Sequence, residues 1–458
     1  MPRLFTSEDE ARFLSLSRRM YHRVEIQNAS GAWDDFTTDG GSVVDWVTSW
    51  KLRATVEEPV VGLDLSLFKQ VDGISLVPYL SPGTEAIKAG RRIRVSVAAR
   101  TIGDPEPSAG DYWLLFDGNV DGWSAGERDE EITLECRDRM GLLADTWTIA
   151  KNTYGSSVGT PVENVTAAII AERISTLSTN YIGDPDFGIF EYEQKRQSML
   201  DAVLANIDLF GWLVRYRWSD AYQAFRVEVF EPDRAIATPQ WTVTPDDYFE
   251  LPLFAEDSDE LRNEGVCDWS GGTVTATDDN SIAEYGRTKT IVLDASQDSQ
   301  ITTEARATAF ITAIVADLSQ PLAQAEASLP LIPWVQINDY YRFTPNPRLF
   351  SEAQDMAVVA YEHSYGPDGA GTRLTLRGQP TGGVTRWDTV RDRLEVVVGV
   401  IPETTDPSLT AADIDFYYTA PSVIAVVVVS LQSRSAMRTR SLVMVVPQIG
   451  SDGGGGEM

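Results

Sequence analysis

Apolar and polar residues alternate strictly in short segments between residues 22 and 100. His22–Ile26, Leu63–Leu67 and Ile93–Val97 all show this pattern, and the turn-forming run Asn28–Gly31 follows the first of them. Because neighbouring side chains of a strand point to opposite faces, the alternation predicts strands with one buried and one solvated face. Such strands are typical of antiparallel sheets and barrels.

Two further pairs of segments predict long hairpins. Tyr112–Phe116 and Glu131–Asp138 form the first pair, with an acidic connection between them. Met356–His363 and Thr372–Leu376 form the second, which turns at Gly366–Gly369. Glycine and proline in that connection favour a turn.

Helical spacing replaces alternation in the middle of the chain. Pro161 is expected at the first position of a helix that Thr160 caps, and a second helix is expected over residues 197–210. The apolar positions of the two helices are Val162, Val165, Ile169 and Ile170, then Leu200, Val203, Leu204 and Ile207. Together with a hairpin of strands at 213–218 and 225–230, they predict a small α+β unit.

Strands and one helix are predicted after this unit. The pattern favours a strand at 273–277, a helix at 303–318, and strands at Trp334–Ile337 and Tyr340–Phe343. Asn338 and Asp339 are expected to form the turn between the last two strands.

The C-terminal region has a composition of its own. Residues 402–407 read as a linker, Val423–Leu431 and Ser441–Val446 as strands of a small added sheet, and the glycines at 453–456 as a mobile end. The longest apolar run, at 423–429, is too short to span a bilayer.

A faint repeat connects the two β regions. A strand near 91–99 and the hairpin at 112–138 match, in order, a strand near 334–343 and the hairpin at 356–377. We expect a mainly β (α+β) chain with two tube-like antiparallel β-barrel domains. The expected domains are 1–155 for the first barrel, 156–235 for the inserted α+β unit, 236–385 for the second barrel and 386–458 for the C-terminal β extension.

The composition narrows the classes of function. The 458 residues are 43% hydrophobic and 10% aromatic, enough for a sizeable core, and the 38 basic and 68 acidic residues give a formal charge of −30. General binding of DNA depends on cations at phosphates and is not expected. The acidity fits either solubility or a surface past which nucleic acid must slide.

Nothing in the sequence points to secretion or to a membrane. The two cysteines, Cys136 and Cys267, are too few for a disulfide framework, and the first residues lack the apolar core of a signal peptide. We therefore expect folding in the cytoplasm.

One short motif resembles the first half of a calcium loop. Asp117-Gly118-Asn119-Val120-Asp121-Gly122 offers oxygen ligands at alternate positions. The twelfth position is Arg128 instead of glutamate, and a strand precedes the motif. A hairpin turn rich in Asp, Asn and Gly is the interpretation we adopt, and whether Asp117–Asp121 binds an ion stays open.

No arrangement of residues identifies an enzyme. The two histidines, His22 and His363, lie in predicted strands without metal-ligand spacing, and there is no nucleophile elbow or phosphate loop. The acidic pairs Glu57/Glu58 and Glu191/Glu193 are expected by chance in so acidic a chain. Twelve scattered tryptophans suit core packing or subunit contacts better than carbohydrate binding. No catalytic, cofactor or metal residues are predicted.

The order of these elements resembles the baseplate-hub or tail-tip proteins of long-tailed phages, which are related to the hub part of type VI secretion spikes. Four parts of residues 20–380 carry the resemblance. They are Arg23–Ile26 with Leu63–Leu67 and Ile93–Val97; Leu115–Gly122 with Ile132–Asp138 and a short helix at Arg139–Ala144; Ser198–Val214; and Asn263–Val266 with Ser281–Gly286 and the helix at 303–318.

The resemblance implies a structural virion protein. In that family each subunit holds two tube-like barrels, so that a homotrimer presents a pseudo-sixfold ring to a sixfold tail tube. The implied neighbours are the tail tube or distal tail protein, the tape measure protein and spike or fibre proteins, with DNA passing through the lumen without specific binding. We expect the acidic segments 117–131, 246–260 and 278–284 of this chain to face that lumen. The implied location is the phage tail tip, assembled in the host cytoplasm.

Two other classes remain as alternatives. A tail-associated hydrolase of cell wall or capsule would need a cleft with converging carboxylates of perturbed pKa. An adhesion module of the bacterial surface would need a signal peptide.

Overall fold

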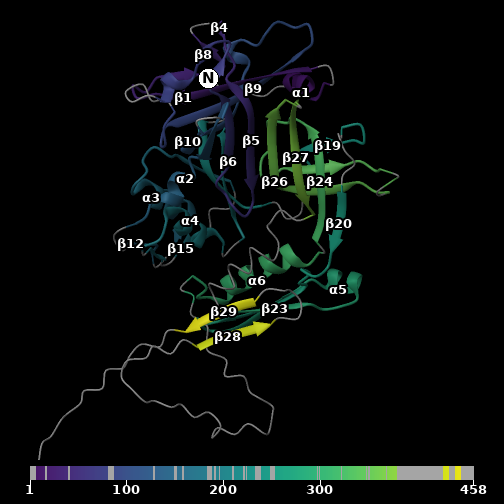
Figure 1. Ribbon diagram of the computed structural model, residues 1–458. Helices are drawn as coiled ribbons and strands as arrows, with labels where there is room; N and C mark the ends of the chain where they lie inside the picture. The colour runs from purple at the N-terminus through teal and green to yellow at the C-terminus, as the bar shows by residue number, and fades with distance from the viewer. Residues whose placement is uncertain are drawn as a thin grey trace, which may run out of the picture. The chain divides into compact units, whose positions relative to one another are not determined.

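The computed structural model describes residues 7–378 with short gaps, and the segments 427–432 and 439–444 (Figure 1). The gaps are residues 16–17, 40–41, 81–86, 127–128, 149–151, 157–158, 183–187, 190–191, 195, 209–210, 220–221, 223, 233–238, 248–252, 297, 299, 321, 347, 349–350 and 368. Contacts divide the chain into Met1–Val396 and Val397–Met458. Within the described residues, no helix is long and apolar enough to cross a membrane.

The mainly β class is confirmed, since a 13-stranded sheet dominates the first unit. Its first half contains β1 (Arg18–Gln27), β2 (Trp33–Asp35), β5 (Val47–Thr55), β6 (Gly62–Phe68), β9 (Arg92–Thr101), β10 (Trp113–Ser124) and β11 (Glu131–Asp138). Its second half contains β19 (Trp241–Val243), β20 (Leu253–Asp257), β24 (Leu322–Pro330), β25 (Tyr340–Phe343), β26 (Gln354–Gly366) and β27 (Gly369–Arg377).

Strands predicted in two barrels lie in one continuous sheet. The strand order is β2-β1-β9-β10-β11-β6-β5-β26-β27-β24-β20, with β25 pairing β26 and β19 pairing β25. The halves meet where Trp50–Thr55 of β5 pairs antiparallel with Ala360–Tyr365 of β26, and we call this pairing the junction. Alternation places Leu52, Leu65 and Leu374 in one buried core beneath the sheet.

The repeat is confirmed in the register of the two halves. The ladder β10·β11 has a bulge between Val120 and Gly122, and β26·β27 has one between Val358 and Ala360. Counting from the bulges makes β9, β10, β11, β6 and β5 equivalent to β25, β26, β27, β24 and β20. Identical residues share positions in this alignment: Arg94 and Arg342, Asp117 and Asp355, Val120 and Val358, Leu134 and Leu374, Arg137 and Arg377, Ser66 and Ser328, and Leu67 and Leu329.

The turns before the repeated strands agree as well. Gly90 donates its N–H to the carbonyl of Val120 at 2.7 Å, and Asn338 donates to Val358 at 2.8 Å. Gly90 has φ +85° and Asn338 has φ +69°, a region that asparagine enters more readily than most residues. The turn predicted at Asn338 and Asp339 is therefore present. The strand predicted at Trp334–Ile337 was wrong, because Asp339 accepts a hydrogen bond from the Gln336 N–H and holds the segment in a turn.

The middle of the chain forms the predicted α+β elements. They are α2 (Gly141–Asp145), β12 (Asn152–Tyr154), β13 (Thr160–Pro161), α3 (Val162–Ala171), β14 (Thr179–Ile182), β15 (Gly188–Ile189), β16 (Tyr192–Gln194), α4 (Met199–Ile207), β17 (Leu213–Ser219) and β18 (Ala224–Phe230). Pro161 is the N-cap of α3 and not its first residue, because Thr160 and Pro161 pair with Ile189 and Gly188 as a strand. Ser198 caps α4 by accepting the Asp201 N–H at 3.0 Å.

A second α+β layer lies within the region expected to be the second barrel. It comprises β21 (Glu264–Trp269), β22 (Gly272–Thr277), α5 (Asp279–Tyr285), β23 (Thr290–Ala295) and α6 (Glu304–Leu318). Its apolar residues Cys267, Phe310 and Ile314 share a core cluster with Val165 and Val203 of the first α+β elements. β21 pairs parallel with β23 through a connection that contains α5, so this layer differs from the antiparallel barrel expected for the region.

The remaining elements are short. They are α1 (Ser7–Leu14), β3 (Thr38–Asp39), β4 (Ser42–Val43), β7 (Gln70–Val71), β8 (Ile74–Ser75) and the 3-10 turns Val77–Leu80 and Ala109–Asp111. In the second unit, β28 (Val427–Gln432) pairs antiparallel with β29 (Thr439–Met444), as the predicted pair of strands there required. The expected linker at 402–407 and the glycine run at 453–456 lie outside the described residues.

Candidate functional site on the polar face of the sheet

The calcium-like motif Asp117–Gly122 lies inside strand β10 and not in a hairpin turn. Asp117 is buried and accepts hydrogen bonds from Arg92, with 2.8 Å between Nε and Oδ1. The expected turn was wrong. Arg92 and Arg137 on the neighbouring strands bind Asp117 and Asp121, and this lets an Asp- and Gly-rich segment stay extended. The described residues contain no group of three or more His, Cys, Asp or Glu side chains placed to hold a metal.

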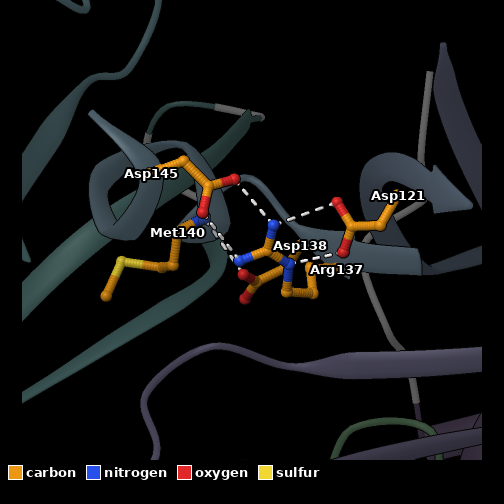
Figure 2. A network of polar contacts seen from close by, with 5 residues as sticks. All are labelled: Asp121, Arg137, Asp138, Met140 and Asp145. Atoms are coloured by element: carbon orange, nitrogen blue, oxygen red, sulfur yellow. Dashed lines mark hydrogen bonds and ion pairs between the residues drawn. The ribbon is translucent and has the colours of Figure 1, made fainter. Parts of the chain in front are cut away.

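The second aspartate of the motif belongs to a network that Arg137 centres (Figure 2). Arg137 of β11 donates to both carboxylate oxygens of Asp121 on β10 and to Asp145 at the end of α2, where the Nη2–Oδ2 distance is 2.6 Å. These hydrogen bonds raise the pKa of the Arg137 guanidinium. The network ties the hairpin to the short helix that follows it.

Asp138 lies next to this network but is buried. Its Oδ1 accepts the backbone N–H of Met140 at 3.0 Å, at the start of α2 (Figure 2). Burial holds the pKa of the Asp138 carboxyl well above its usual value, and the backbone hydrogen bonds offset only part of that effect. Asp138 therefore acts as a structural cap between β11 and α2.

The side chains on the face opposite the core form what we call the polar face of the sheet. Arg53 of β5, Glu362 of β26 and Arg373 of β27 are direct neighbours across three strands. Glu362 binds Arg53 and Lys51 at 3.0 Å each, and Arg53 also lies 3.3 Å from Asp64. Cross-strand pairs of opposite charge stabilise a sheet. On this face, carboxylates therefore alternate with cationic partners.

The junction concentrates these charges. Burial by itself would raise the pKa of Glu362, but hydrogen bonds from Lys51 and Arg53 outweigh it and the pKa is lowered. Both cations come from the first half of the sheet and the carboxylate from the second. The ion pairs thus join the two halves.

Both histidines lie in strands, as predicted, and serve the core. His363 is fully buried, with 2.9 Å between its Nδ1 and Thr372 Oγ1, and burial lowers its pKa to about 3. His22 lies 3.0 Å from Asp45 and packs edge-on against Tyr365. Because His363 and Thr372 are both buried, this pair has no access to a substrate.

Of the two acidic pairs, the structure describes both members of Glu57/Glu58 alone. Glu57 lies 3.9 Å from Arg377, and Glu58 is exposed beside it. Glu191 lies outside the described residues. Asp278 caps α5 by accepting the N–H of Ser281 at 3.0 Å, so the expected acidic loop 278–284 is a capped helix.

Tryptophans from distant segments line a cavity of about 260 Å³, which sequence reasoning missed. Trp113, Trp218, Trp241 and Trp334 all contribute to its wall. Asp339 is the carboxylate among the lining residues, and burial raises its pKa to about 6. Only tertiary contacts bring these tryptophans together, because they come from three separate regions of the chain.

Two tryptophans are exposed in the described part of the chain. Trp123 on β10 is 44% exposed and Trp147 is 54% exposed, whereas Trp46 and Trp50 are buried in the core. The prediction of core packing therefore holds for the buried ones. An exposed tryptophan on a strand is the type of residue found at interfaces.

No model of a protein family matches the sequence, and no curated protein matches it in sequence. Solved structures match it in fold. The 43 kDa tail protein of prophage MuSo2 from Shewanella oneidensis has a TM-score of 0.54 at 14% identity and covers 79% of this chain and 99% of its own. The tail protein from Neisseria meningitidis MC58 has a TM-score of 0.53 at 11% identity and covers 78% of this chain and 96% of its own. The protein therefore has the fold of phage tail proteins, as the resemblance in its sequence implied.

Proposed function

We propose that the protein is a structural component of a phage tail, a homotrimeric baseplate hub that adapts the sixfold tail tube to the tail tip. The observation that carries this proposal is the repeated half-sheet, with its bulges, turns and identical residues in register. Two equivalent halves in each of three subunits supply the six equivalent positions that a sixfold tube requires. The protein would then be part of the virion, at the tail tip, after assembly in the host cytoplasm.

The polar face is the surface we assign to the DNA channel. Its arginines are already engaged by carboxylates of neighbouring strands, as Arg53 is by Asp64 and Glu362 and Arg373 is by Glu326. Cations engaged in this way are poorly available to phosphate, whose capture drives general DNA binding. DNA would therefore slide along the wall without being held.

This differs from a channel lined by carboxylates alone. Asp117, in one of the segments expected to face the lumen, is buried and paired. The net charge of −30 then contributes a general repulsion of phosphate and solubility, while the wall itself is balanced.

The proposed neighbours are the tail tube or distal tail protein on one side and spike or fibre proteins on the other, with the tape measure protein in the channel. We propose no catalytic role and no cofactor. The alternative function, a cell-wall or capsule hydrolase, would have to use the tryptophan-lined cavity as its active site. However, its described lining includes one carboxylate, Asp339, whereas glycoside hydrolysis uses two.

Native mass measurement and electron microscopy of the assembled protein test the proposal. We expect a trimer with pseudo-sixfold density around a central channel. A stable monomer or dimer within intact tails contradicts it. Turnover of peptidoglycan or polysaccharide that one substitution at Asp339 abolishes would favour the hydrolase.

A further inference from the structure

The two halves of the sheet differ at one edge. β5 has a partner on both sides, because it pairs with β6 and, across the junction, with β26. Its equivalent in the second half is β20, which is the last strand of the sheet order. Among the strands that the structure describes, β20 pairs with β24 alone.

The complementary edge lies on β10. At the junction, β26 offers Ala360, Tyr361 and Glu362 to β5, and the equivalent residues of β10 are Gly122, Trp123 and Ser124. These three pair with β11 on one side, and β9 pairs with β10 only as far as Asn119. Within the described part of the chain, nothing pairs with their other side.

Side-chain exposure supports the same conclusion. Tyr361, opposite Ala54 in the junction, is 9% exposed, whereas the equivalent Trp123 is 44% exposed. Trp123 lies directly opposite Leu134, a fully buried core residue, so it is on the core face of the sheet. At an unpaired strand edge, a half-exposed tryptophan whose equivalent is covered by a neighbouring strand fits a covering strand from outside the chain.

We infer that β20 of one subunit pairs with Gly122–Ser124 of β10 in the next subunit, so that the junction within each chain is repeated between chains. This inference rests on the proposed trimer and names the seam that closes it. The partner is a second copy of this chain, bound by strand addition at a sheet edge.

The repeat also fixes the register of the seam. Thr55↔Ala360, Ala54↔Tyr361 and Arg53↔Glu362 translate into Asp257↔Gly122, Glu256↔Trp123 and Ala255↔Ser124. The Arg53–Glu362 ion pair of the junction is replaced by alanine and serine. Backbone hydrogen bonds and cover for Trp123 would therefore hold the seam, without the cross-strand ion pair of the junction.

A disulfide tests the register. Ala255 and Ser124 are both exposed, so A255C and S124C do not disturb the core. Residues directly opposite each other in an antiparallel pair have Cα atoms about 4.5 to 5.5 Å apart, within disulfide reach. The native thiols interfere little, because burial raises the pKa of both Cys136 and Cys267.

The matched control shifts the register by one residue. A255C with A125C places the two thiols on opposite faces of the pair. Under mild oxidation, A255C/S124C should give a covalent trimer on a non-reducing gel, and A255C/A125C should react roughly tenfold more slowly. Equal reaction of both pairs overturns the register, and a disulfide within one chain overturns the seam.

Substitutions at Trp123 test the seam without cysteine. W123Y introduces tyrosine, the residue at the equivalent position 361, and should leave the trimer intact. W123E removes the apolar contact and sets a carboxylate directly opposite Glu256, so it should yield monomers that still fold. If W123E is still a trimer, or if the wild type is a trimer but A255C/S124C does not crosslink between subunits, the seam is refuted and the proposed function stands. A wild-type monomer refutes both.

Discussion

The two halves of the sheet have the same backbone register but different surroundings. Asp117 is 5% exposed between Arg92 and Arg94, whereas the equivalent Asp355 is 29% exposed beside Arg342. Gly118 in the first half has Met356 as its equivalent in the second. The hydrogen-bond ladder thus determines where each residue lies, and the neighbouring elements determine what it contributes.

Packing at Gly118 illustrates how one register accommodates two side-chain solutions. The ring of Phe116 lies over Gly118, and a Cβ there would come within 2.5 Å of a ring carbon. In the second half, Gln354 stands in place of Phe116 and the buried Met356 fills the core position. An aromatic side chain from two residues away replaces the missing side chain of glycine.

The largest expected effect concerns His363, which β5 buries at the junction, whereas its equivalent Ala125 is exposed. Its folded pKa of about 3 lies below the ordinary value of 6.5, so the unfolded chain takes up a proton that the folded chain refuses. Stability is therefore lost as the pH falls from 6.5 towards 3, by about 5 kcal/mol in all. Urea unfolding at pH 7 and pH 4 should show a smaller pH dependence for H363L than for the wild type, and equal dependence would contradict the assignment.

Asparagine at the equivalent aspartates should separate a buried ion pair from an exposed one. D117N leaves Arg92 and Arg94 half-buried without their carboxylate and should lower the free energy of unfolding by about 3 kcal/mol. D355N removes a partner that solvent can replace and should have little effect. Thermal unfolding of both variants gives the comparison, and similar losses would mean that burial does not distinguish the halves.

Alanine at Gly118 should destabilise the first half by about 1 to 3 kcal/mol through overpacking. Its Cβ meets both the Phe116 ring and the backbone carbonyl oxygen of Arg137. Gly62 on β6 is the matched control, because a Cβ there meets nothing within 4 Å. Chemical denaturation of G118A and G62A should therefore differ, and an unaffected G118A would show that the Phe116 ring moves freely.

The smallest effect is expected at the junction itself. R53A removes the cation shared by Asp64 and Glu362, but Arg53 is 55% exposed, so the cost should be at most about 1 kcal/mol. The loss should shrink further in 1 M salt, which screens exposed charges. A large loss that salt does not change would assign Arg53 a packing role instead.

Much of the fold could be predicted from local patterns. Alternation located the strands of both halves, and helical spacing located α4 and α6, because these periods reflect which face of an element is buried. The order of the repeat was also visible. Its register was not, because the bulges at Val120 and Val358 shift the pairing by one residue without a signal in the sequence.

The errors have local causes. Asp117–Gly122 has the composition of a turn, yet Arg92 and Arg137 on the two neighbouring strands hold it extended. Trp334–Ile337 has the composition of a strand, yet the carboxylate of Asp339 holds it in a turn. In both cases a charged partner decided against the local propensity.

The sequence by itself determined the mainly β class, the order of its elements and the buried face of each strand, since these depend on neighbouring residues and on burial alone. Only the tertiary structure decided that both halves share one sheet, that Arg53 and Glu362 meet across the junction, and that Trp123 lies at an open edge. Strand pairing and ion pairs join residues separated by about 300 positions, and the hydrophobic pattern does not encode which partner a strand edge finds.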